Sequence, residues 1–147
     1  MESYFRAKLW LIIASSIITY LISLLYAFFT LDALWVNTAC FLYNVGVNSF
    51  ILMYASTYQK KRLDLSKGSA FNYQGTSAVQ FLVAFPLLII PIIIFKSFDV
   101  FGAPYYGLAT LGILGIISLG FNKYWFRAVI QNFNEKKYKN AKGFREA

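Results

Sequence analysis

The 147-residue chain is 59% hydrophobic and only 14% charged, with a net charge of +8 and a mean hydropathy of +0.55. Water-soluble domains usually carry about 25% charged residues, and a chain this short cannot hide so much apolar surface in one core. The composition excludes an ordinary water-soluble domain and predicts an all-α, polytopic membrane protein.

Four uncharged stretches divide the chain, each longer than the about 20 residues that a helix needs to cross the hydrocarbon core. We expect transmembrane helices at about 9–30, 33–57, 77–95 and 105–125, which make a four-helix transmembrane domain over residues 1–126. A loop at 58–76 joins the second helix to the third. Residues 127–147 form a basic tail, and their apolar spacing predicts that the fourth helix runs on along the inner surface.

The basic residues set the predicted orientation. All but Lys96 of the 14 basic residues lie before the first helix, between the second and third, or at the end of the fourth and beyond it. The positive-inside rule therefore places both termini and the middle loop in the cytoplasm, and we expect a multi-pass protein of the bacterial inner (plasma) membrane. The loop's basic side chains are predicted to contact lipid headgroups or a coupling partner: Lys60, Lys61, Arg62 and Lys67. Attraction to anionic lipid accounts for the charge, so no nucleic-acid partner is expected.

The first helix carries Ser15, Thr19 and Ser23 at four-residue spacing, a ridge of small side chains that permits close helix contact. At the second helix, Asp32 is predicted to be the N-terminal cap. Cys40, the only cysteine, has apolar neighbours, which predict a buried structural thiol. A lone cysteine also excludes an internal disulfide and a cysteine metal cluster.

A polar stripe marks the second helix. At 100° per residue, Asn37, Asn44 and Asn48 fall within about 40° of one another. Unpaired amides are costly in hydrocarbon, so the stripe should face another helix or a wet cavity. Interhelical hydrogen bonding is one interpretation, and the lining of a substrate path is the other.

The third helix contains Pro86 and Pro91 within "LVAFPLLIIPIIIF". A membrane helix persists through proline with a kink, because no water is present to satisfy a fully broken helix. We therefore predict a kinked third helix packed against protein. In the fourth helix the glycines form no GxxxG pair, and we expect them to allow close packing. Pro104 suits the first turn of that helix.

Catalytic groups are not recognisable in the chain. Histidine is absent, and no acid/base pair, nucleophile triad or G-x-x-x-x-G-K-[ST] loop is found. We expect neither an enzyme nor a bound cofactor or metal. Apart from Lys123 near the end of the fourth, the predicted spans also lack the charged side chains that proton- or ion-coupled transporters generally need.

Three segments resemble the C-terminal part of bacterial ABC-2-type permease-like membrane proteins: "VGVNSFILMYASTYQKKRLDLSKGSAFNYQG", "FLVAFPLLIIPIIIF" and "EKKYKNAKGFRE". The resemblance covers nearly the whole chain but only about the last third of such a protein. It implies a fragment or partial subunit of an exporter that acts with an upstream permease half and a separate ATPase. It also implies that the 58–75 loop is the coupling surface.

Three functions remain open at this point. The leading hypothesis is a membrane-embedded permease-like component of an ABC-type export system, in which a separate subunit hydrolyses ATP. The alternative is a structural or assembly subunit that packs against larger membrane proteins. The third is a small transporter that works as a dimer on its own.

Overall fold

The computed structural model describes residues 2–58 and 78–145. Helices make up nearly all of this part of the chain, and no strand occurs in it, so the all-α prediction is confirmed. The predicted loop residues Lys60, Lys61, Arg62 and Lys67 lie outside the described residues.

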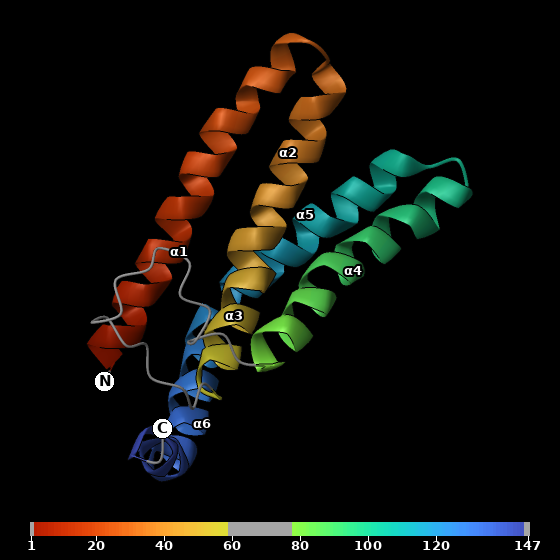
Figure 1. Cartoon of the computed structure of the whole chain (residues 1–147). Coiled ribbons are helices and arrows are strands. Elements are labelled where there is room, and N and C mark those ends of the chain that lie inside the picture. The colour runs from red at the N-terminus through yellow and green to blue at the C-terminus, as the bar shows by residue number, and fades with distance from the viewer. Residues whose placement is uncertain (1, 59–77, 146–147) are drawn as a thin grey trace.

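The first hairpin pairs two long helical runs (Figure 1). Helix α1 (Glu2–Ser23) tightens into the 3-10 turn η1 (Leu24–Phe28), a common way for a helix to end. Thr30 is extended and stands at the N-cap of α2 (Leu31–Tyr43). Asp32 is therefore not the cap, and this prediction was wrong: the helix begins two residues earlier, which places Asp32 in its first turn.

A single π-helical turn interrupts the second run. Helix α2 passes into η2 (Asn44–Asn48) and then α3 (Ser49–Ser56). The wider turn inserts into a helix that otherwise keeps one direction, and such turns are frequent at functional sites. Two of the three predicted stripe asparagines, Asn44 and Asn48, bound this turn.

The second hairpin consists of α4 (Ala78–Val100) and α5 (Pro104–Gly120). Helix α4 is continuous through Pro86 and Pro91; the predicted kink stays a prediction. The helix runs past the predicted end at 95 to Val100, and Lys96 and Asp99 form an exposed ion pair of 2.8 Å in this last part. Gly102 closes the hairpin with a φ of 71°, and Pro104 starts α5 as expected.

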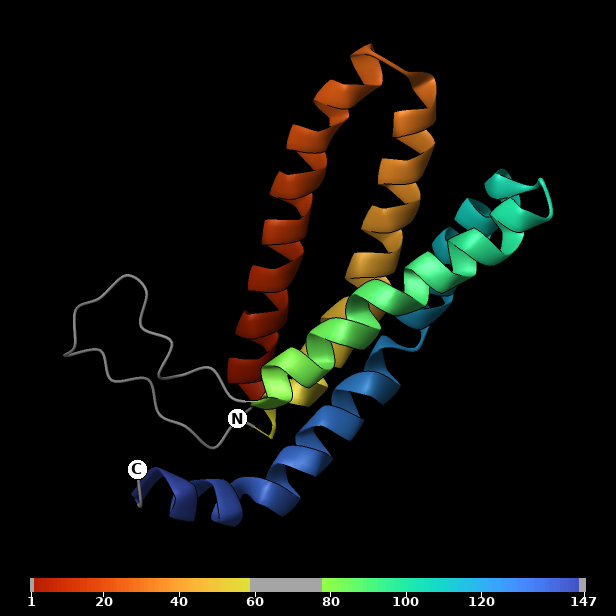
Figure 2. The same ribbon diagram turned by 45° about the vertical axis from the view of Figure 1, so that its right-hand side comes forward.

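The fourth helix differs from the prediction. Helix α5 ends at Gly120, not near residue 125, and α6 (Asn122–Arg145) leaves it at 68° (Figure 2). The apolar sequence gives way to Asn122 and Lys123 at this point, and Phe121 leaves the helical conformation. The predicted boundary between residues 126 and 127 therefore lies inside α6.

Helix α5 is the centre of the bundle. It packs against α2, η2 and α4, and its buried side is rich in glycine. At the crossing with η2, a Cβ added to Gly46 would lie 2.7 Å from the Gly115 Cα. Ser118 secures the same crossing, because its Oγ donates a hydrogen bond of 2.6 Å to the Gly46 carbonyl oxygen. The two glycines let the backbones touch directly.

Helix α6 covers the end of the bundle that lies away from the hairpin turns, beneath α1 and α3. Phe5, Phe50, Met53 and Val129 form a buried cluster that joins the three helices. Asn132 on α6 donates a hydrogen bond to Thr57, and both side chains are buried. The start of α1 and the start of α6 therefore lie at the same end of the molecule.

Lys136 completes this contact just beyond α3. Its ammonium lies 3.1 Å from the centroid of the Tyr58 ring, a cation–π arrangement. The hydrogen bond from the same ammonium is the main cause that lowers the pKa of the Tyr58 phenol below its usual value.

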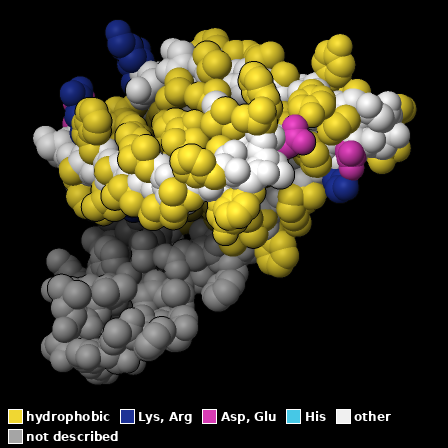
Figure 3. Space-filling model, turned by 90° about the horizontal axis from the view of Figure 1, so that it is seen from above, with side chains coloured by type: hydrophobic (Ala, Val, Ile, Leu, Met, Phe, Trp, Pro, Cys, Tyr) yellow, Lys and Arg dark blue, Asp and Glu magenta, His cyan; other side chains and the backbone are white. Residues whose placement is uncertain are grey.

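Several helices are long and apolar enough to cross a membrane. Among the described residues these are Glu2–Phe28, Leu31–Ser56 and Val83–Val100, and α5 with the adjoining part of α6 makes a fourth if the bent pair is one span. The most apolar stretches of α1 and α4 contain no buried residue. The surface is accordingly hydrophobic, with few charged side chains on the face that Figure 3 shows.

Candidate functional site: a polar-floored groove between the hairpins

Helix α2 separates the outer helices α1 and α4, and cavities lie along it. Helix α1 packs mainly against α2 and α3, whereas α4 packs mainly against α5. The face of α2 that carries the asparagine stripe is therefore only partly covered. Two of the cavities meet on this face, and together they form what we call the central groove.

The α1-side cavity has a volume of about 230 Å³. The hydroxylated ridge expected to make close helix contact lines this cavity instead, and the lining residues from α1 and the facing α2 include Ser15, Thr19, Ser23 and Asn37. The hydroxyls mainly bond their own helix, since Thr19 Oγ1 donates to the Ser15 carbonyl at 3.0 Å and Ser23 Oγ to the Tyr20 carbonyl at 2.8 Å. This side of the groove is the more polar one.

The α4-side cavity is larger, at about 480 Å³, and mostly apolar. Side chains of α4 and α5 form one wall, among them Leu88, Pro91, Phe95 and Leu111. The polar groups on the facing wall are the Tyr43 phenol at the end of α2 and Asn44 and Asn48 in η2. Cavities of this size and lining are typical of small-molecule sites.

Cys40 and Asn44 line both cavities and so join them. Cys40 is exposed, so the prediction of a buried thiol was wrong. Its apolar sequence neighbours belong to other faces of α2, and Cys40 itself precedes Asn44 by one helical turn. That i, i+4 spacing to a stripe residue was the signal for its place in the groove.

The three stripe asparagines have different surroundings. Asn37 Nδ2 donates to the Ser23 carbonyl oxygen at 2.9 Å, where η1 begins. Asn48 Nδ2 donates to Asn44 Oδ1 at 2.6 Å, whereas Asn48 Oδ1 is buried and has no partner among the described residues. Asn37 thus ties α1 to α2, and the pair at η2 lies on the groove.

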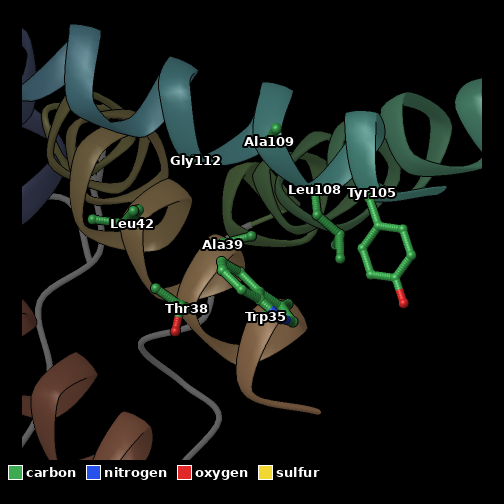
Figure 4. A pocket seen from close by; sticks show the side chains of 8 residues that line it. All are labelled: Trp35, Thr38, Ala39, Leu42, Tyr105, Leu108, Ala109 and Gly112. Atoms are coloured by element: carbon green, nitrogen blue, oxygen red, sulfur yellow. The ribbon is translucent and has the colours of Figure 1, made fainter. Parts of the chain in front are cut away.

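A third cavity of about 410 Å³ lies on another side of α2, between α2 and α5 (Figure 4). Its lining is almost wholly apolar, from Trp35 and Leu42 on α2 to Leu108 on α5. Tyr105 stands at its rim and donates a hydrogen bond of 2.9 Å to Asp32 Oδ1. This bond joins the starts of α2 and α5, so the turns of the two hairpins lie at one end of the molecule.

The described part of the chain does not bring metal-ligating side chains together. In residues 2–58 and 78–145, no three His, Cys, Asp or Glu side chains are placed to hold a metal ion. The groove offers amides, hydroxyls and apolar walls, a set suited to binding a molecule.

Sequence reasoning missed Gly46. Its neighbours in "NVGVN" show only that a small residue interrupts the polar stripe. The importance of Gly46 depends on Gly115, which lies far along the chain and faces it across the helix crossing. A pair of glycines on two different helices gives no local pattern.

The comparisons with known proteins give one match. A family model described as a family of unknown function, DUF5687, matches residues 1–147. No curated protein and no solved structure matches the chain. Because the match covers the whole sequence, the chain belongs to the DUF5687 family.

Proposed function

We propose that the chain is a membrane-embedded, permease-like component of an ABC-type export system, in which a separate subunit hydrolyses ATP. The central groove carries this proposal. The groove combines asparagine and hydroxyl groups with apolar walls and is open on one side. Such a surface is expected of a transport path that other helices complete. The resemblance of "FLVAFPLLIIPIIIF" to ABC-2-type permeases supports the same function.

The proposed topology has four crossings, with both termini and the 58–76 loop in the cytoplasm. Arg6 near the start of α1 and Lys123, Arg127 and Lys136 on α6 lie toward the end of the bundle where these two helices meet. The hairpin turns lie at the other end, which carries Asp32 and the paired Lys96 and Asp99. The positive-inside rule assigns the basic end to the cytoplasm of the inner membrane.

An ATPase partner is the first test. The tagged full chain is purified from its native membranes in a mild detergent, and bound proteins and ATP hydrolysis are measured. We expect an ATPase to copurify and to be lost after high-salt washing if it docks through basic loops. Two results together contradict the export function. No ATPase copurifies with the chain, and ATP hydrolysis in the original membranes is the same with and without the chain.

A second function is favoured by the exposed faces of α1 and α4. Large apolar side chains cover them, for example Trp10 at 70% exposure and Phe85 at 64%. These faces suit a structural or assembly subunit that packs against a larger membrane protein. Replacing both Asn44 and Asn48 with Leu separates the two functions: lost assembly supports the structural subunit, whereas lost export from an intact complex supports the permease.

A further inference from the structure

We infer that the α4-side cavity of the central groove binds a neutral amphiphile that has an extended apolar chain and a hydroxyl headgroup. This inference deepens the proposed function, because such a molecule would be the class of compound exported. Binding needs no ATPase, so its failure and the failure of export can be told apart.

Hydrogen-bonding groups of η2 that lack partners define the headgroup. Asn44 is exposed on the groove, and its Nδ2 has no hydrogen-bond partner among the described residues. Asn48 Oδ1, one turn away, is buried and also without a partner in that part of the structure. Asn44 Oδ1 accepts the bond from Asn48 Nδ2 and keeps a second lone pair that can accept from a ligand. One side of the cavity thus offers both a donor and an acceptor.

Pro91 adds an acceptor on the facing wall. The carbonyl of Leu87, one turn earlier, would normally accept from the N–H of residue 91, and proline has none. Leu87 and Pro91 both line the α4-side cavity. In a bilayer, a carbonyl freed by proline needs another donor. A hydroxyl is the simplest group that accepts from Asn44 and donates to an acceptor on either wall.

Charge and shape define the rest of the ligand. Lys96 is the charged residue among those that line the cavity, and its ammonium is paired with Asp99 at 2.8 Å, so a neutral headgroup fits best. From Val36 to Asn48 the lining extends along about 18 Å of helix. A cavity of about 480 Å³ stretched over that length suits one extended apolar chain.

Cys40 provides a direct measurement, because it lines the cavity, is exposed and is the chain's only cysteine. The full chain is placed in lipid nanodiscs, and the rate of Cys40 alkylation by N-ethylmaleimide is measured. The probes are 1-dodecanol and dodecyl methyl ether, in which a methyl group replaces the hydroxyl hydrogen and so removes the hydrogen-bond donor. We expect dodecanol to slow alkylation saturably, by about threefold or more, and the ether at equal membrane concentration to slow it less than half as much.

Variants assign the effect to the cavity. Asn44→Leu removes the amide that the probe oxygen can accept from, so it should weaken protection by dodecanol, whereas the matched change Asn134→Leu, at an exposed site on α6, should leave that protection unchanged. Leu88→Trp offers a second test that leaves the asparagines in place: the larger side chain should fill the cavity, slow alkylation without any probe and remove the alcohol effect.

Three results overturn the inference. The first is no protection by dodecanol, and the second is equal protection by both probes, which shows apolar filling without headgroup recognition. The third is an alkylation rate that changes with the number of chains per nanodisc and not with dodecanol. That result assigns the groove to a second copy of the chain.

Discussion

Gly46 and Gly115 show how a single hydrogen in place of a methyl group decides where two helices cross. A Cβ on Gly115 would lie 2.8 Å from the Tyr43 backbone nitrogen, and a Cβ on Gly46 would meet the Gly115 backbone. Backbone atoms cannot rotate away as a flexible side chain can. Between apolar helices in lipid, such close contact is a main source of association, since lipid is as apolar as leucine.

Gly115→Ala should therefore destabilise the bundle. Overpacking of this kind costs about 1–3 kcal/mol, more than the at most about 1 kcal/mol that alanine gains over glycine in a helix. Gly120→Ala is the matched control, because nothing lies within 4 Å of its added Cβ, and its stability should be unchanged or slightly higher. Unfolding in mixed micelles by increasing amounts of dodecyl sulfate, followed by circular dichroism, measures both. Equal midpoints would show that α5 does not cross η2 at these glycines.

The residues of the central groove were only partly predictable. The spacing of Asn37, Asn44 and Asn48 placed them on one stripe, because helical periodicity is a local property of the sequence. Periodicity could not show that Asn37 bonds the Ser23 carbonyl while Asn44 and Asn48 bond each other. It also could not show that Cys40 is exposed, since that depends on how far α1 and α4 stand from α2.

Among the elements, α6 is held to the bundle mainly by one cluster. Met53 is fully buried at its centre, and Val129 is exposed by only 1%. The apolar face of α6 was visible in the sequence as Phe126, Val129, Ile130 and Phe133 at helical spacing. The break at Phe121 was not, because the change to Asn122 and Lys123 does not by itself fix where a helix bends, and the bend depends on the packing of α6 against α3.

Met53→Ala should loosen α6 without unfolding the hairpins. Removing a buried methionine side chain costs about 2–5 kcal/mol, and part of this loss falls on the docking of α6. Amide hydrogen exchange in α6 should become at least about tenfold faster, while exchange in α5 stays the same. Gln131→Ala, at an exposed position of α6, is the control and should have little effect. If Met53→Ala leaves α6 as protected as before, lipid and not this cluster holds the helix.

At the scale of the whole molecule, the fold has two distinct ends. Cluster residues Phe5 and Val129 join α1 to α6 at one end, and the bond between Tyr105 and Asp32 joins the two hairpins at the other. The uncharged lengths of the sequence were enough to predict long apolar helices. The contacts that form each end join residues far apart in the chain, so no local sequence pattern could predict them.

This arrangement predicts the labelling of both hairpin turns from one side of the membrane. In a Cys40→Ser background, single cysteines replace Phe29 or Phe101, which are 83% and 85% exposed at the two turns, or Ser66 or Ala147, which the proposed topology places inside. A membrane-impermeant maleimide should label the two turn positions in intact spheroplasts, and the other two only after the membrane is opened. Denatured samples, in which all four must react, control for the amount of protein. Labelling of Phe29→Cys and Phe101→Cys from opposite sides would contradict four crossings, because the bond between Tyr105 and Asp32 could not then form within one chain.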